Sequence, residues 1–504
     1  MDFRRVIWLL KAQVIVLAFI LCLYGSSESF WPDEIFDKAT TVLRTSWIQW
    51  TVCFLALVSS VGLGWLKGTQ FRGSSGEDDA CVWLIAALLI GGGAYFLQFP
   101  TASKTTQAMA WFCGMALGHA VAAQLRVSAK HRIDLLRCAV IVPVLLLSAS
   151  SLASPGGMLF YYRGHSRWSG LWDTPNVFGL LMGAGLALAV GWFSEILDSK
   201  SGIPFRNTGS HSRGAMKRGL GILCLSAIIL LGRGLFHSYS RGAWLGTAAG
   251  LVYLAMAARE PRNGLLNADF GNPHSDAGNP AESGKKGTRF QARSSSVVWL
   301  RHSRVSLFVI LLSAFLLCFW HCRGTNWRLA HRAFSIVNTV DFSWRNRIAA
   351  WKGALWIMAE HPWLGAGWSQ AENQYQNFYL DPKVYSSQAI EMNDFLLLGA
   401  TLGLPALICF GMYLWLSLTG RTESRKSGKW RTNKLNLAAD GRHGTVLPRT
   451  CRAGAVVLLV GFWFDGGLFA LPTAATFWIL LELGNVWNHE TYGTHEMKLG
   501  GKCN

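Results

Sequence analysis

The chain has 504 residues, of which 51% are hydrophobic and only 15% are charged, and its mean hydropathy is +0.26. Soluble globular domains carry about a quarter charged residues, so this composition excludes an ordinary soluble protein and indicates a polytopic membrane protein. The net charge of +19 would also suit a nucleic-acid-binding protein, and the position of the basic residues decides between these two classes.

Apolar runs of roughly membrane-spanning length predict an all-α fold with about 12 transmembrane helices. The expected spans are 6–24, 48–66, 80–97, 108–125, 138–152, 177–193, 220–236, 243–258, 305–320, 395–418, 453–468 and 472–486. Alternate connections between them carry most of the 47 Lys and Arg residues. This bias places the N-terminus and the basic connections in the cytoplasm and excludes the nucleic-acid interpretation.

The spans divide the chain into four expected parts, and a large helical loop between spans nine and ten faces outward. Residues 261–296 are rich in Gly, Asn, Ser and Pro, and such a segment cannot bury enough apolar surface to order, so we expect a disordered cytoplasmic linker. The parts are spans one to six in 1–219, a core of spans seven to ten in 220–418 with the linker 261–296 and the outer loop 321–391, a basic cytoplasmic loop in 419–452, and spans eleven and twelve with the tail in 453–504.

The outer loop contains an amphipathic pattern. Large apolar residues recur at i, i+4, i+7 and i+11, namely Trp344, Ile348, Trp351 and Leu355. This spacing predicts a helix over 343–360, which lies along the outer membrane-water boundary or caps the spans. The Pro after His361 ends the helix, and a Gly-Ala-Gly turn at 365–367 follows.

Two arginines lie near the outer ends of spans seven and eight. Arg241 starts span eight, and Arg233 lies within the outer end of span seven. If one helix continued through both, their guanidiniums would share a face, eight residues being little more than two turns. An arginine in a membrane is costly and is a functional candidate by default, although snorkelling to the headgroups is the alternative. Two converging guanidiniums suit a phosphate or pyrophosphate group.

The outer loop supplies further candidates. Arg347 and Trp351 share a face of the predicted helix at i, i+4, where a stacked cation–π pair is the structural alternative to a functional role. The sequence Ile-Glu-Met-Asn-Asp at 390–394 closes the loop just before span ten. Carboxylates there are either boundary residues or groups at the mouth of the site.

These segments carry a resemblance. The sequence Ser-Arg-Gly-Ala-Trp-Leu-Gly at 240–246 resembles the signature of the O-antigen ligase and O-antigen polymerase family of bacterial membrane glycosyltransferases. Arg347-x-x-x-Trp351 and the His-Pro-Trp-Leu-Gly-Ala-Gly sequence at 361–367 resemble that family's large periplasmic loop. The Asp-Thr-Pro-Asn sequence at 173–176 is a weaker likeness.

The resemblance implies transfer of a glycan from an undecaprenyl-pyrophosphate-linked donor to an acceptor hydroxyl, without a metal or another cofactor. The acceptor would be a glycan or a lipid, and the protein would lie in the bacterial cytoplasmic membrane among its lipids, with the site facing the periplasm. Cationic side chains must hold the pyrophosphate and stabilise charge on the leaving group, and a base must take the acceptor proton. The implied pyrophosphate ligands are Arg241, Arg347 and Arg233, with supporting roles for Ser240, Trp351 and Asn176.

One position departs from the family pattern. The family motif is His-Asn, nine residues, then Gly-x-x-Gly, whereas this chain has Met392-Asn393, nine residues, then Gly403-Leu404-Pro405-Ala406. Methionine cannot accept the proton, so catalysis is expected from the neighbours of Met392. The candidates are Glu391, Asp394 and Asn393. Otherwise His237, His331 or His361 reaches the site, or the chain has lost ligase chemistry.

A second hypothesis is a transporter or flippase, or a non-catalytic binder, for a lipid-linked glycan. A transporter should carry ionisable residues near mid-bilayer and matched broken helices in two halves. Mid-span charges are few here, Lys11 and Asp465 among them, no half-repeat is visible, and the polar residues gather on one side of the membrane. This distribution favours an outward-facing enzyme.

Overall fold

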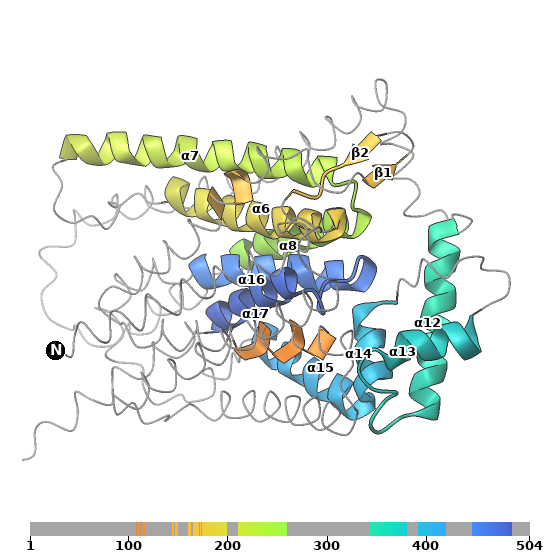
Figure 1. The fold of residues 1–504 in the computed structure, drawn as a ribbon. Helices are drawn as coiled ribbons and strands as arrows, with labels where there is room; N and C mark the ends of the chain where they lie inside the picture. The colour runs from red at the N-terminus through yellow and green to blue at the C-terminus, as the bar shows by residue number, and fades with distance from the viewer. Residues whose placement is uncertain are drawn as a thin grey trace, which may run out of the picture. The chain divides into compact units, whose positions relative to one another are not determined.

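The computed structural model describes parts of the chain, almost entirely as helices (Figure 1). The described residues are some of those in 107–118 and in 144–149, then 160–198 except 163–164, 171 and 173, and 210–259, 342–380, 392–419 and 446–485. Their elements are β1 (Phe160–Tyr162), β2 (His165–Arg167), α6 (Pro175–Asp198), α7 (Ser210–His237), α8 (Arg241–Arg259), α12 (Phe342–Glu360), α13 (Gln370–Gln374), the π-helix η2 (Tyr375–Tyr379), α14 (Asp394–Leu402), α15 (Leu404–Thr419), α16 (Val446–Phe464) and α17 (Leu471–Asn485).

Two of the described helices are long and apolar enough to cross a membrane, at Pro175–Ile196 in α6 and Gly219–His237 in α7. Helices also lie at the expected spans eight, eleven and twelve. The expected spans one, two, three and nine lie outside the described residues, as do the linker 261–296 and most of the loop 419–452. The count of twelve spans therefore stays a prediction.

α6 is the central helix of this assembly, packing against both α7 and α16, and α16 packs in turn on α17 (Figure 1). α7 leaves one side open, where Ile222 and Ile229 are 67% and 62% exposed. An exposed face made of large aliphatic side chains is what a helix in contact with lipid requires, because no polar group there would be satisfied by hydrocarbon.

Span ten is not one continuous helix, contrary to the prediction. α14 ends at Leu402 and α15 begins at Leu404, and Gly403 between them has φ 86°. This left-handed conformation is easily reached only by glycine, so the break is local to that residue. Because the sequence is apolar on both sides of Gly403, hydropathy alone predicted one continuous helix.

The loop helix α12 begins at Phe342 and ends at Glu360, within one residue of the predicted bounds. Its fully buried face, however, is not the predicted stripe of large residues. Ala350, Ala354 and Ile357 are 0% exposed, whereas Leu355 is 54% exposed. Small residues let α12 approach its neighbours closely, and the space beside Gly353 is filled by the Tyr375 ring.

The contacts group Met1–Gly250 with Phe334–Asn504 in one compact unit and Leu251–Ala333 in another. All geometry described below lies within the first unit.

Candidate functional site

A tight turn separates α7 from α8 and presents Arg241. The turn comprises Ser238, Tyr239 and Ser240, and Tyr239 has φ 52°. The Ser240 hydroxyl accepts a hydrogen bond from the Ala243 amide at 3.1 Å, which is the side-chain cap expected at a helix N-terminus. Arg241 is therefore the first residue of α8, and it is only 4% exposed.

The hairpin of β1 and β2 holds this turn from the other side. The Arg167 guanidinium donates from Nε to the Ser238 carbonyl at 3.0 Å and from Nη2 to Asn176 Oδ1 at 2.8 Å. The Trp168 amide donates to the His237 carbonyl at 3.0 Å. Asn176, expected to support the site, thus orients Arg167, which in turn fixes the backbone next to Arg241.

The expected pairing of Arg233 with Arg241 rested on one continuous helix, and that premise is wrong. α7 ends at His237, and the turn redirects the chain before Arg241. Arg233 is exposed, and its guanidinium lies 5.1 Å from the centre of the Trp168 ring, on which His237 is also stacked. A guanidinium over an indole is a favourable cation–π contact, so Arg233 has a partner of its own at the rim. A pyrophosphate-binding role for Arg233 stays a prediction.

Asp465 is the residue on which the site converges. It follows the last residue of α16 and so lies outside the helix, in the 465–470 connection to α17, rather than within a span as predicted. Its carboxylate accepts hydrogen bonds from the Ser240 hydroxyl and, at 3.2 Å, from the Ala243 amide. A carboxylate at these groups is stabilised by the partial positive charge of the α8 N-terminus.

The close approach of Asp465 requires a glycine in the first turn of α8. A Cβ on Gly242 would lie 2.6 Å from the carboxylate of Asp465 and 2.9 Å from Phe464 Cβ. Arg241 thus stands between Ser240, which donates to Asp465, and Gly242, against which Asp465 packs. The Ser-Arg-Gly sequence therefore gives the turn its cap, its cation and its close contact.

α12 brings Arg347 to the carboxylate of Asp465. Arg347 Nη2 lies 3.6 Å from Asp465 Oδ1, and both side chains are almost fully buried, at 6% and 3% exposed. At this distance the contact is an ion pair rather than a hydrogen bond. Trp351, one turn further along α12, packs edge-on against Trp344 and Trp463. Trp351 therefore helps to fix the helix that carries Arg347.

The residues that follow Met392 begin α14 and reach the same connection. Asn393 caps α14 by accepting from the Phe395 amide at 2.8 Å. The carboxylate of Asp394, 4% exposed, accepts from the Leu468 amide at 2.6 Å. Burial raises the pKa of Asp394 to about 7, against the stabilising amides of Leu468 and Gly467. Glu391, the other acidic candidate, lies outside the described residues.

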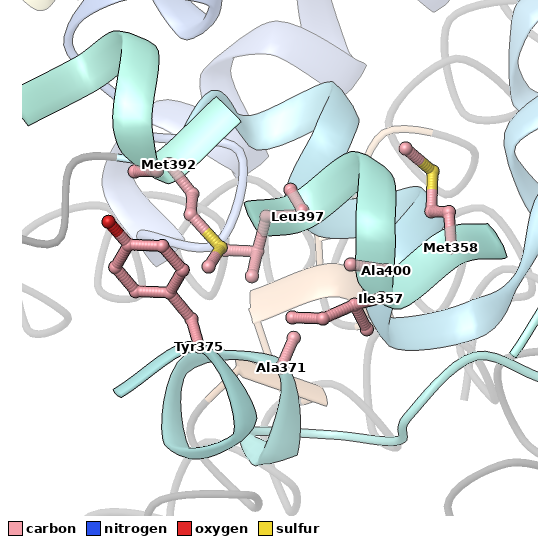
Figure 2. Close-up of a cluster of buried hydrophobic side chains, with 9 residues drawn as sticks. Ile357, Met358, Ala371, Tyr375, Met392, Leu397 and Ala400 are labelled. Atoms are coloured by element: carbon pink, nitrogen blue, oxygen red, sulfur yellow. The ribbon is translucent and has the colours of Figure 1, made fainter. Parts of the chain in front are cut away.

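Met392 itself belongs to an apolar cluster (Figure 2). It is 7% exposed, and its side chain lies among Tyr375, Leu397 and Ile357. Because these neighbours come from η2, α14 and α12, Met392 helps to join the loop helices to the start of α14. The position of the family histidine is therefore occupied by a packing residue.

The histidines differ in their distance from the arginines. His361 is exposed and follows the last residue of α12, about 20 Å along the helix axis from Arg347 at roughly 1.5 Å per residue. It therefore cannot act beside Arg347. His237 immediately precedes the turn that presents Arg241, whereas His331 lies outside the described residues.

Sequence reasoning named Asp465 only as a mid-span charge and assigned it no role in the site. The sequence does contain an indication that Asp465 lies in a connection between helices. The acidic residue is followed by two glycines, Asp465-Gly466-Gly467, between two apolar runs that are almost continuous. Gly466 and Gly467 have φ 73° and 131°, which mark a tight connection. Within the described residues no group of three His, Cys, Asp or Glu side chains is arranged to hold a metal ion.

The arrangement is suited to binding an anion. Arg347 and the N-terminus of α8, which the buried Arg241 begins, meet at the carboxylate of Asp465 and form a polar cluster within an otherwise apolar protein. Guanidiniums hold phosphate oxygens through pairs of parallel hydrogen bonds, and in a buried site their charge acts strongly on a developing negative charge.

Comparison with known proteins gives one kind of match. No curated protein matches the chain. Residues 226–411 match the family model described as O-antigen ligase. The matched segment contains Arg241, Arg347 and Met392, and it ends before Asp465. Residues 226–411 of this chain are therefore similar to the O-antigen ligase family, whose members are polytopic membrane proteins that act on lipid-linked glycans.

Proposed function

We propose that the protein is an integral membrane glycosyltransferase that transfers a glycan from an undecaprenyl-pyrophosphate-linked donor to an acceptor hydroxyl. The reaction would take place on the periplasmic side of the bacterial cytoplasmic membrane, as the distribution of Lys and Arg in the sequence predicts. The observation that carries this proposal is the convergence of Arg347 and the N-terminus of α8, whose first residue is Arg241, on Asp465, within and just beyond the segment that matches the O-antigen ligase family.

In this proposal Arg241 and Arg347 hold the pyrophosphate. Both belong to the first unit and both are buried, so the charge of each guanidinium is weakly screened, and Asp465 offsets part of the charge of Arg347. Asp465 is a positioning residue: it fixes Arg347 by the ion pair and fixes the start of α8 by two hydrogen bonds. The site therefore extends beyond the matched segment into the α16–α17 connection.

The reaction breaks the bond between the anomeric carbon of the glycan and the pyrophosphate oxygen. A bond forms between that carbon and the acceptor oxygen, the acceptor proton passes to a base, and undecaprenyl pyrophosphate leaves with its charge stabilised by the arginines. Asp394 and Glu391 are the candidate bases, and Asn393 is expected to assist. A pKa of about 7 supports Asp394, because a base works best when its pKa is near the operating pH.

A second function deserves a test because of Met392. Its side chain is packed among apolar residues in place of the family histidine, which favours a protein that binds the lipid-linked glycan without transferring it. A transporter or flippase for the same lipid belongs to this second class. Both functions need the arginines, so loss of binding alone does not separate them.

The separating experiment follows the lipid-linked glycan in a strain lacking this protein, complemented by the native chain, Arg241→Lys or Arg347→Lys. Lysine keeps the charge but loses the paired donors of the guanidinium, so both variants should lose most of the activity while still inserting into the membrane. The matched control is Arg345→Lys, which alters an exposed arginine two residues from Arg347 on α12.

Each function predicts a different distribution of the glycan lipid. A transferase leaves it on the periplasmic face when the protein is absent, and the native chain clears it with formation of a product. A flippase leaves it on the cytoplasmic face, and a non-catalytic binder alters neither pool. Full activity of both lysine variants would refute the arginine site for a transferase and for a flippase.

A further inference from the structure

The turn after α12 is held firmly against the break between α14 and α15. The Leu404 amide donates to the Pro362 carbonyl at 2.8 Å, and the Ala366 amide donates to the Ala400 carbonyl at 2.7 Å. A Cβ on Gly403 would overlap the backbone of Trp363 and Leu364. Because backbone pairs with backbone at these points, the side chains of the turn have fixed positions on the surface.

These side chains form an exposed apolar patch. Leu355 and Trp356 at the end of α12 are 54% and 62% exposed, and Trp363 and Leu364 in the turn are 76% and 56% exposed. We call these four residues the elbow patch. Large exposed apolar residues that adjoin one another are uncommon on a surface facing water and mark an interaction surface.

The elbow patch continues into the exposed stripe of α15. Leu404, whose amide bonds to Pro362, is 42% exposed, and Ile408 and Trp415 follow on the same helix face at 58% and 65%. The residues recur at i, i+4 and i+11, so they form one line along the helix. The exposed side of α15 is thus as apolar as its buried side, which identifies it as a lipid-facing surface in a membrane protein.

The exposed face of α12 changes character along its length. Arg345 and Lys352 occupy it in the earlier turns, Leu355 and Trp356 occupy it further along, and the exposed Glu360 ends the helix. Basic side chains are stable beside lipid phosphates, and indole rings are stable just below them, at the boundary with hydrocarbon. This order fits a helix that enters a lipid layer at Leu355 and Trp356.

We propose that the elbow patch is inserted into the outer leaflet of the bilayer, with α12 tilted so that Leu355 and Trp356 lie deeper than Arg345 and Lys352. The occupant of the patch is therefore membrane lipid, continuous with the lipid that covers α15. The inference needs the outer location of this loop, which is part of the proposed function, but it does not need catalysis. It makes the loop that carries Arg347 a membrane-anchored element rather than one suspended in the periplasm.

The test uses nitroxide labels on the full chain, freed of its 11 cysteines and reconstituted into phosphatidylethanolamine–phosphatidylglycerol vesicles. Labels replace Trp363 or Leu364 in separate variants, with Ile408 as the lipid-facing control and Lys352 as the water-facing control. Power saturation compares collision with oxygen, which concentrates in hydrocarbon, and with a nickel chelate, which stays in water. Labels at Trp363 and Leu364 should match Ile408, with high oxygen and low nickel collision rates.

Two results would overturn the proposal. Nickel collision at Leu364 equal to that at Lys352 would place the patch in water, and low collision with both reagents would mean that a second copy or another protein covers it. If the cysteine-free chain does not fold, benzoylphenylalanine at Trp363 in the native background provides the second measurement. Phospholipid adducts are then expected, and protein adducts alone would refute membrane insertion. Neither readout depends on glycan transfer, so failure of the proposed function leaves this result intact.

Discussion

The pairing of Asp465 with Arg347 can be measured as a coupling free energy. At 3.6 Å, the interaction between the two charges is about 4 to 5 kcal/mol at an effective dielectric constant of about 20. Removing one member of such a buried pair leaves the other charge uncompensated and typically costs about 3–5 kcal/mol. We therefore expect Asp465→Asn and Arg347→Gln each to lower the free energy of unfolding by about 3 kcal/mol or more.

The double variant should lose much less than the sum of the two single losses, because it removes both charges. The expected coupling is at least about 2 kcal/mol, as for buried charged neighbours that act as a unit. Denaturant titration in mixed micelles gives the four free energies, and the 24 Trp residues supply the fluorescence signal. Asparagine can still accept from Ser240 and Ala243, so the start of α8 should be retained.

A control cycle combines Asp465→Asn with Arg345→Gln, whose arginine is exposed on the same helix. These two changes should be additive within about 0.5 kcal/mol. If the cycle with Arg347 is equally additive, the two buried side chains do not stabilise one another. The role of Asp465 as the positioning residue of the arginine site would then be wrong.

Two further substitutions test the start of α14. Met392→His should lower the free energy of unfolding by about 1–3 kcal/mol, because the mostly apolar cluster around residue 392 cannot replace all the hydrogen bonds that the imidazole makes in water. Met392→Leu should cost less than about 1.5 kcal/mol. A stable histidine variant with gained transferase activity would show that position 392 faces the acceptor. Asp394→Asn should abolish the pH dependence of transfer. A base with a raised pKa of about 7 is protonated and inactive below that pH, so the rate of the native protein should fall as the pH drops through 7. A native rate and pH profile in the asparagine variant would place the base elsewhere.

Local sequence patterns were sufficient to predict the features that depend on a single helix or a short segment. Apolar runs located the helices from α6 to α8 and from α16 to α17, and the 3.6-residue period with Pro362 located α12 to within one residue. Arg241 stood out because charge in or beside apolar sequence is costly unless it is used, and Arg347 because it shares a helix face with Trp351 in a segment that resembles the family's loop. These inferences depend on neighbours within a few residues, which the sequence displays directly.

The contacts that assemble the site join residues far apart in the chain, and no local pattern reports them. Asp465 meets Ser240 across 225 positions, and Asp394 meets Leu468 across 74. The same limitation hid the contact of Arg233 with Trp168, which directly follows strand β2 of a hairpin that hydropathy does not reveal.

The sequence by itself determined that this is a helical membrane protein with an O-antigen ligase signature, because hydropathy, charge bias and short motifs are properties of the chain alone. The tertiary structure decided which charges meet, which face of α12 is buried and that Met392 is a packing residue. These outcomes depend on close packing between separate helices, where small residues such as Gly242 permit contact and a buried carboxylate must find its partners.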